Sequence, residues 1–300
     1  MPLSVPANSR RQFIMGAVTT IGGIITLKQE AFALSGSDPD FIALLSDTHI
    51  AADPTVINRK TNMTDNLKAV RSQLLDLPLL PNSTSLNGEC AYLVGLSDDY
   101  NALAGLIDPL AKAGHSMHYL MGNHDKRDNF RAGIKSAQKS EPLEGRHVTR
   151  LECRKANIVM LDSLDKTNGT PGILGAEQLK WIETALDMDK NKPTIVMVHH
   201  NPVLEGPTGN GLTDSKALFD ILVPRKNVKM VVFGHTHKIS FTKYEGIHLV
   251  NLPPVAYPFA EGDPSGWVAM HLAKTGAEMK INALNGHPVN GKSYQLDWRS

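Results

Sequence analysis

Short apolar runs alternate with amphipathic segments along the chain from residue 41 to residue 233. Phe41–Ser46 is an almost continuous apolar run, which is typical of a strand buried on both faces of a sheet. Similar runs predict strands at 118–121, 157–161, 194–198 and 228–233, with a weaker one at 83–86. Apolar residues at helical spacing predict helices at 64–75, 99–112, 176–186 and 214–222. This alternation indicates an α/β fold.

Local signals set the expected ends of these helices. Thr64 can cap the first helix, and Gly114 is a stop signal after the second. Pro109 lies within the second helical pattern, so we expect it to kink or divide that helix.

The pattern changes after residue 237. Strands are predicted at 247–252, 267–272 and 278–284, with no helix signal between them. This strand-rich end predicts a mixed sheet, or a second sheet packed on the first. The tail from Asn285 is rich in Gly, Asn and Pro, and we expect it to be loose or irregularly packed. Without a linker or repeat, residues 35–300 are predicted to form one domain.

The first 33 residues have the pattern of an export signal. Ser9–Ile14 contains Arg10 and Arg11 and resembles the twin-arginine signal, and Ala31–Ala33 is a small-x-small cleavage site. The apolar stretch between them is shorter than about 18 residues and contains glycines, so it is a poor spanning helix. A basic tail and a membrane anchor are the alternatives. We predict that residues 1–33 engage the export machinery, and that the protein is exported to the periplasm without a stable membrane anchor.

The amino-acid composition is that of an ordinary globular protein and indicates little else about function. The chain has 300 residues, 41% of them hydrophobic and 20% charged, with a net charge of +1. Nothing in this balance indicates binding to nucleic acid or to an anionic membrane. Cys90 and Cys153 are too few for a disulfide framework, so we expect two buried thiols, with a single bridge as the alternative.

Candidate metal ligands follow the predicted strands in five short segments. The segments are Asp47-Thr48-His49, Gly88-Glu89, Gly122-Asn123-His124-Asp125, His199-His200 and Gly234-His235-Thr236-His237. Carboxylate, amide and imidazole groups together suit divalent transition metals. Each segment alone is weak, because a lone His at a strand end is usually a hydrogen-bonded surface or core residue. Their joint presence predicts a metal site, since ligands in α/β sheets gather at the carboxyl ends of strands.

Two features of these segments suggest how the side chains would converge. Asp47 and His49 are two residues apart, as are His235 and His237, so in extended backbone each pair would point the same way. The glycines before Asn123 and His235 are expected to let the chain turn sharply at the strand end.

The motifs D-x-H, G-N-H-D, H and G-H-x-H resemble those of the calcineurin-like metallophosphoesterases. The stretch Gly175–Ile182 before Val198–Pro202 is most similar to the class III cyclic nucleotide phosphodiesterase branch. The resemblance implies a four-layer α/β/β/α sandwich of two mixed sheets flanked by helices. It also implies a metal-dependent phosphoric ester hydrolase that acts on a small-molecule phosphoester, a phosphodiester rather than a monoester.

The resemblance also assigns roles to individual residues. One metal ion would be held by Asp47, His49 and His237, and the other by Asn123, His199 and His235. Glu89 would bridge two divalent or mixed-valence ions of Fe, Mn, Zn or Co, and a bridging hydroxide would attack phosphorus. The two catalytic residues would be His124, which protonates the leaving oxygen, and Asp125, which orients the His124 ring.

Glu89 departs from the family pattern, which has Asp at the bridging position. Its side chain is one methylene longer and must fold back to reach both ions. The alternative function is therefore a weakly active or non-catalytic protein with an impaired metal site. Asp98 and Asp99 are alternative candidates for the bridging residue, but their position fits the cap and first turn of the following helix better. Tyr92 resembles an iron ligand of purple acid phosphatases, but His49 would occupy that place, so we favour a role in packing or in supporting the metal ligands from behind.

Overall fold

The computed structural model describes residues 36–135, 137 and 143–300. The predicted signal peptide, residues 1–33, lies outside the described residues. No helix of the described part is long and apolar enough to cross a membrane. Cys90 and Cys153 are both free and buried, so the prediction of two buried thiols is confirmed.

Two six-stranded sheets form the centre of the fold. The strands of the first are β1 (Ser37–Leu45), β4 (Leu80–Asn87), β5 (Met117–Leu120), β12 (Gly266–Leu272), β13 (Gly276–Ala283) and β14 (Ser293–Asp297). Their order is β14-β13-β12-β1-β4-β5. The strands of the second are β6 (Thr149–Glu152), β7 (Asn157–Met160), β8 (Thr194–Met197), β9 (Val228–Phe233), β10 (Ser240–Tyr244) and β11 (Ile247–Asn251). Their order is β10-β11-β9-β8-β7-β6.

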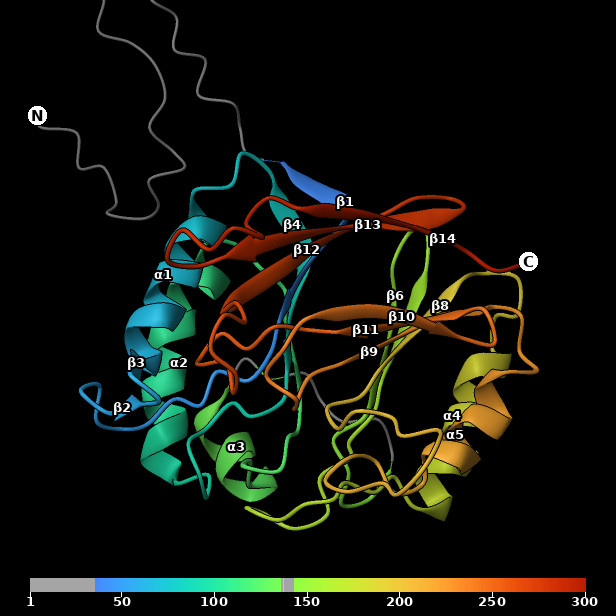
Figure 1. Ribbon diagram of the computed structural model, residues 1–300, viewed down its shortest axis with the longest axis horizontal. Coiled ribbons are helices and arrows are strands. Elements are labelled where there is room, and N and C mark those ends of the chain that lie inside the picture. Colours follow the sequence, from blue (N-terminus) through green and yellow to red (C-terminus); the bar gives the residue numbers. More distant parts are fainter. Residues whose placement is uncertain (1–35, 136, 138–142) are drawn as a thin grey trace, which may run out of the picture.

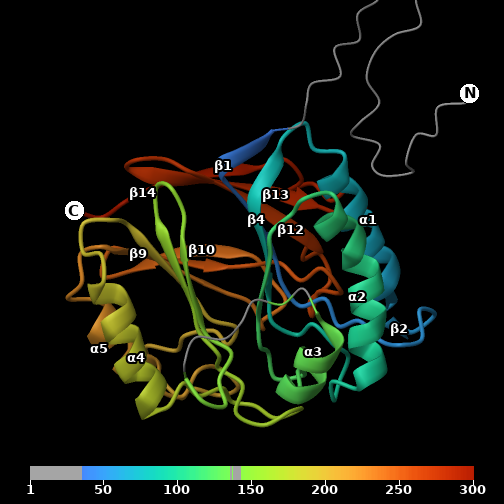
Figure 2. The same ribbon diagram turned by 180° about the vertical axis from the view of Figure 1, so that it is seen from behind.

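Each sheet is covered on its outer face by helices (Figure 1). The helices are α1 (Met63–Leu75), α2 (Ser97–Lys112), α3 (Arg127–Gly133), α4 (Ala176–Asp187) and α5 (Ser215–Leu222). The reverse view shows α1 and α2 on one side of the sheets and α4 and α5 on the other (Figure 2). A short hairpin of β2 (Ile57–Asn58) and β3 (Thr61–Asn62) precedes α1. The predicted four-layer α/β/β/α sandwich is confirmed.

Strand β1 shows why its sequence is apolar at consecutive positions. Phe41, Ala43 and Leu45 pack in the cluster beneath α1 and α2. Ile42 and Leu44 point the opposite way, into the cluster between the two sheets. Successive side chains of a strand alternate between its faces, and both faces are buried here. The same alternation along β8 and β9 builds a third cluster beneath α4 and α5.

Both sheets are mixed, and their parallel strands lie together. In the first sheet β1, β4 and β5 are parallel, while β12, β13 and β14 continue it antiparallel. In the second sheet β7, β8, β9 and β11 are parallel. The carboxyl ends of parallel strands meet at one edge of a sheet, which is where the candidate ligands follow them.

Several local predictions were wrong. Asn62, not Thr64, caps α1, because its side chain accepts a hydrogen bond from the Asp65 amide at 3.0 Å. Helix α2 is continuous through Pro109, which lies near its carboxyl end. The tail is not loose: β14 pairs with β13, and Leu296 is buried against the cluster between the sheets.

The elements missed by the sequence patterns are α3 and the strands β2, β3, β6, β10 and β14. The weakly predicted strand proved to be β4, which lies between β1 and β5. Its buried residues include Ser83, Thr84 and Ser85, so a hydrophobic pattern could not reveal it.

Candidate metal centre

The candidate ligands converge from both sheets onto one site. Asp47 follows β1 and Glu89 follows β4 in the first sheet, while His199 and His235 follow β8 and β9 in the second. Asn123 comes just after β5. The side chains of Asp47, His49, Glu89, Asn123, His199 and His237 are all buried, and His235 is partly buried. Convergence at strand ends therefore brings together residues that are far apart in the sequence.

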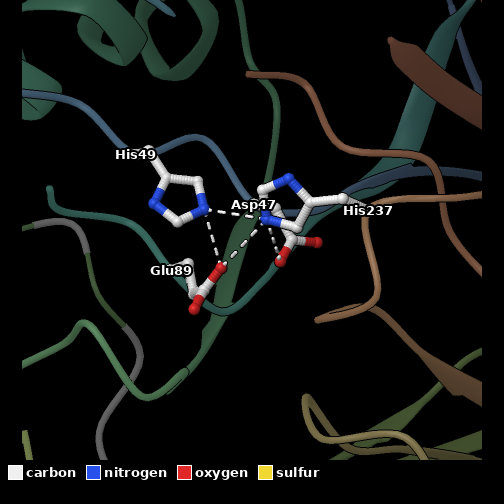
Figure 3. Close-up of side chains that lie close together, drawn as sticks. All are labelled: Asp47, His49, Glu89 and His237. Atoms are coloured by element: carbon white, nitrogen blue, oxygen red, sulfur yellow. Dashed lines mark hydrogen bonds and ion pairs between the residues drawn. The ribbon is translucent and has the colours of Figure 1, made fainter. Parts of the chain in front are cut away.

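A first group of donors consists of Asp47, His49, Glu89 and His237 (Figure 3). His49 Nε2 lies 2.7 Å from Glu89 Oε2 and 3.0 Å from His237 Nε2. His237 Nε2 lies 3.4 Å from Glu89 Oε2 and 3.6 Å from Asp47 Oδ1. Ligand atoms that share one ion at about 2.1 Å lie roughly 3 Å apart, so these separations fit a common ion.

A second group consists of Glu89, His199 and His235, whose donor atoms lie within 4.8 Å of one another. His199 Nε2 is 3.7 Å from Glu89 Oε1. Three buried atoms beside this group have no hydrogen-bond partner: Asn123 Oδ1, His199 Nε2 and His235 Nδ1. Unpaired buried polar atoms are costly and therefore rare. One amide oxygen and two imidazole nitrogens form a donor set that fits a divalent transition metal.

Glu89 belongs to both groups, and its two oxygens face different ones. Oε2 is the atom nearest to His49 and His237, whereas Oε1 is the atom nearest to His199. Gly122 packs directly against this residue: a Cβ there would lie 2.5 Å from both the Cγ atom and the backbone nitrogen of Glu89. The longer side chain thus reaches both groups in this backbone.

The backbone at the site is left-handed rather than extended, which corrects the expectation for D-x-H and H-x-H. Residues Asp47, His49, Glu89, His235 and His237 have φ values of 53°, 45°, 50°, 68° and 53°. Non-glycine residues adopt this region at an energetic cost, and such strain is concentrated at functional sites. The paired side chains converge because the chain curls around the site.

The two glycines before Asn123 and His235 also act differently from the expectation. Neither Gly122 nor Gly234 has a positive φ. A Cβ at Gly234 would lie 2.1 Å from Ser46 Oγ and 2.6 Å from Asp47 Oδ2. Glycine is therefore needed at both positions for close approach of neighbouring segments rather than for a sharp turn.

Backbone carbonyls orient three of the histidines. Nδ1 of His199 bonds to the Asn87 carbonyl at 2.7 Å, and Nδ1 of His237 bonds to the Tyr257 carbonyl. A carbonyl only accepts, so each Nδ1 carries the proton and leaves Nε2 free to face the site. The sequence could not predict these hydrogen bonds, because every residue has a backbone carbonyl whatever its side chain.

His124 is held in the same way at the entrance to the site. Its Nδ1 bonds to the Leu93 carbonyl at 2.6 Å, and its Nε2 lies 3.7 Å from Glu89 Oε1. The Leu93 carbonyl therefore takes the orienting role that the sequence assigned to Asp125.

The Asp125 carboxylate points away from the His124 ring, which corrects the predicted role. It accepts hydrogen bonds from the amides of Cys90, Ala91 and Gly122 and from the Tyr100 hydroxyl. Burial raises the pKa of Asp125, and these donors oppose that rise. Asp125 ties the segment after β4 to the segment after β5, and so positions both Glu89 and Asn123.

Three other candidates make their hydrogen bonds to residues outside the two donor groups. His200, the second residue of the His199-His200 segment, is fully buried, and its Nδ1 bonds to Ser163 Oγ at 2.8 Å. Its ring occupies space that Gly172 leaves open. The Tyr92 hydroxyl bonds to the Asn58 amide at 3.4 Å, and the ring packs against the core, as a packing role requires. Asp99 accepts from the Leu96 amide at the start of α2.

Burial and mutual charge shape the protonation of the site. Burial lowers the pKa of His49 to about 4 and raises the pKa of Asp47 to about 7. Burial also opposes ionisation of Glu89, but His49, His199 and His237 outweigh it and hold its pKa well below the usual range. Burial disfavours a charged His199, yet Glu89 raises the pKa of that ring to about 9. A negative Glu89 is thus paired with the imidazoles that a metal ion would require as neutral ligands.

A cavity of about 420 Å³ opens over this centre. Its lining includes five of the candidate ligands together with His124 and residues of four other segments: Asn58, Arg59, Asn168, Thr170, Asn210, Tyr257 and Phe259. The cavity lies within the usual size range of small-molecule sites.

Known proteins share this sequence pattern and fold. A family model described as calcineurin-like phosphoesterase matches residues 42–239. The chain is 28% identical over 245 residues to a probable cyclic nucleotide phosphodiesterase of Synechococcus sp., covering 79% of this chain and 89% of that protein. It is 26% identical over 231 residues to the 3',5'-cyclic adenosine monophosphate phosphodiesterase CpdA of Pseudomonas aeruginosa, covering 73% and 77%. A dimetal phosphatase from Danio rerio has the same fold, with a TM-score of 0.68, 14% identity, and coverage of 87% of this chain and 100% of that one.

Proposed function

The chain belongs to the calcineurin-like phosphoesterase family, and from this premise we propose that it hydrolyses cyclic nucleotides or related phosphodiesters at a site for two metal ions. That it is a metal-dependent phosphoesterase follows from the family and from its buried cluster of His, Asp and Glu. The observation that carries the two-metal proposal is the placement of Glu89, whose oxygens face separate donor groups.

Each donor group would hold one ion. Asp47, His49 and His237 would bind the first ion through the atoms that already cluster. Asn123, His199 and His235 would bind the second through atoms without other partners. Glu89 would lie between them. Bound ions would supply Lewis acidity to the phosphoryl oxygens and a water of lowered pKa as nucleophile.

His124 is placed to deliver a proton to the leaving oxygen. Its Nδ1–H is held by the Leu93 carbonyl, so Nε2 is the atom that faces the cavity. In the protonated ring, Nε2–H can donate to the oxygen that leaves phosphorus. Its side chain is 21% exposed, so it can exchange protons with solvent.

A cyclic nucleotide is favoured over a monoester by the relatives, whose names describe cyclic nucleotide phosphodiesterases. The test is a substrate panel on protein loaded with Mn²⁺, Zn²⁺ or Fe²⁺. We expect turnover of cyclic AMP, cyclic GMP or bis(p-nitrophenyl) phosphate to exceed that of p-nitrophenyl phosphate, with two bound ions per chain. Folded, metal-loaded protein without turnover of any diester would refute the proposal, and one ion or none would favour an impaired site.

We also propose export through the twin-arginine route, on the strength of the motif at Arg10 and Arg11. The mature chain would begin near Leu34, just before the first described residue. Amino-terminal sequencing of the protein from a periplasmic fraction tests this proposal, and a mature chain that retains Arg10 would contradict it.

A further inference from the structure

A strained hairpin turn lies at the mouth of the cavity. Arg59 and Lys60 connect β2 and β3 as a two-residue turn, with φ values of 46° and 65°. Two positive φ values define a type I′ turn, which strongly favours Asn-Gly or a similar pair. The turn conformation therefore does not explain why long side chains occupy both positions. Backbone strain of this kind points to a function of the residues that bear it.

The hairpin between β10 and β11 provides a comparison within the same chain. Its turn residues, Glu245 and Gly246, also have positive φ values, of 48° and 75°. That turn has glycine at its second position, as the type I′ conformation prefers. It lies outside the residues that line the cavity over the metal centre. Of these two turns, the one at the cavity mouth has no glycine to relieve the backbone strain.

The strained turn is held in place. The Asn58 side-chain amide donates to the Tyr257 hydroxyl at 3.2 Å and to the Tyr92 hydroxyl at 3.4 Å. At the other end of the hairpin, Asn62 caps α1. Both ends of the turn are thus anchored, so Arg59 is presented to the cavity from a fixed base.

Arg59 ends a stack of planar groups that begins at a metal ligand. The Phe259 ring stacks on the His237 ring, with centroids 3.9 Å apart and planes inclined by 6°. The Arg59 guanidinium carbon lies 5.0 Å from the Phe259 centroid. Among the residues that the structure describes, no carboxylate lies within ion-pair distance of Arg59. An exposed guanidinium without an acidic partner is available to a ligand.

The direction of the stack indicates which part of a ligand Arg59 would meet. The reacting phosphoryl group would lie beside His237 Nε2, near the plane of that ring. Arg59 lies beyond Phe259: the His237 and Phe259 ring centroids are 3.9 Å apart, and the Arg59 guanidinium carbon is 5.0 Å from the Phe259 centroid. It is therefore placed toward the group esterified to phosphorus rather than toward the phosphoryl oxygens.

We propose that Arg59, supported by Phe259, forms a nucleobase subsite in which a purine stacks on the guanidinium plane. This proposal rests on the proposed function for its choice of ligand. A guanidinium is planar and weakly hydrated, so it stacks on aromatic rings in a way that a lysine ammonium does not. The cavity lining also includes Asn168, Thr170 and Asn210, which are polar and offer no aromatic face. The base is thereby directed to the Arg59 side.

The test compares two ligands that differ only in the base. Calorimetric titration of Mn²⁺-loaded protein with AMP and with ribose 5-phosphate measures the contribution of the purine. We expect the native protein to bind AMP about tenfold more tightly. In Arg59→Ala the affinity for AMP should fall about tenfold, while that for ribose 5-phosphate changes less than twofold. Lys60→Ala is the matched control, since it removes a cation from the same strained turn, and it should leave both affinities within twofold.

Arg59→Lys separates stacking from charge. It should lose AMP affinity as Arg59→Ala does, because it keeps the charge but not the plane. The proposal is overturned if Arg59→Lys retains AMP affinity, if Arg59→Ala weakens both ligands equally, or if the native protein does not prefer AMP. Hydrolysis is measured separately: absent diester turnover with a normal AMP preference would refute the proposed function alone. Turnover of cyclic AMP with an unchanged KM in Arg59→Ala would refute the subsite alone.

Discussion

Shortening Glu89 by one methylene, in Glu89→Asp, should weaken metal binding. The sequence alone suggests the opposite, since a strained bridge would be relieved by the residue usual in the family. In the structure, the two carboxylate oxygens of Glu89 already face both donor groups: Oε2 is 2.7 Å from His49 Nε2, and Oε1 is 3.7 Å from His199 Nε2. The site is therefore shaped around the longer side chain.

The magnitude follows from this geometry. Removing one methylene withdraws the carboxylate by about 1.5 Å, the length of a C–C bond. Ligand atoms that share an ion need to be about 3 Å apart, so the shortened side chain cannot serve both groups. We expect one ion to be lost or bound about a hundredfold more weakly, which corresponds to roughly 2.7 kcal/mol. Glu89→Gln keeps the length but removes the charge, and it should also lose the shared binding.

Metal content after dialysis and titration of Mn²⁺ into metal-free protein measure the effect. Asp98→Asn is the control: it removes an exposed carboxylate of α2 and should leave the metal content unchanged. Thermal unfolding checks that each variant is folded. The prediction is contradicted if the Glu89→Asp variant binds two ions as tightly as the native protein. The length of the Glu89 side chain would then not matter for bridging. If Glu89→Gln also left the metal content and affinity unchanged, Glu89 would not be a ligand.

Three further predictions follow from other residues. His124→Ala should keep the metal content but lower the hydrolysis rate by about 10²–10⁴. The loss of rate should be smaller for a substrate with a p-nitrophenolate leaving group. Loss of metal would instead show that His124 is a ligand. Burial lowers the pKa of His118 to about 4, below the unfolded value of about 6.5, so its contribution to stability is present above pH 6.5 and is lost as pH falls toward 4. His118→Gln should flatten the fall of Tm over this range in metal-free protein, and an unchanged slope would contradict it. Replacing Arg10 and Arg11 by Lys should trap the precursor inside the cell, whereas unchanged export would remove the twin-arginine argument.

Most of the architecture could be predicted from the sequence because it depends on local patterns. Strands such as β1 and β9 are buried on both faces, so their apolar runs stand out. Strand β4 was barely visible, because its interior position is filled with Ser and Thr. Strand β14 was missed, since its pairing with β13 follows a turn rich in glycine and asparagine.

The identity of the candidate ligands was also readable, because each follows a strand and has the chemistry of a metal donor. What the sequence could not supply was the direction of the side chains. Asp125 is adjacent to His124, yet its carboxylate turns to the amides of Cys90 and Ala91, which only the fold brings near. The Leu93 carbonyl instead orients His124.

The sequence by itself determined that strand ends bearing His, Asp, Asn and Glu would meet in an α/β sandwich. Only the tertiary structure decided how Glu89 reaches both donor groups, because its Oε2 faces His49 after β1 and its Oε1 faces His199 after β8, in the other sheet. Only the tertiary structure placed Arg59 at the end of the stack on His237. Residue type and spacing specify local conformation, whereas distances between atoms remote in sequence are set by how the two sheets and their loops pack.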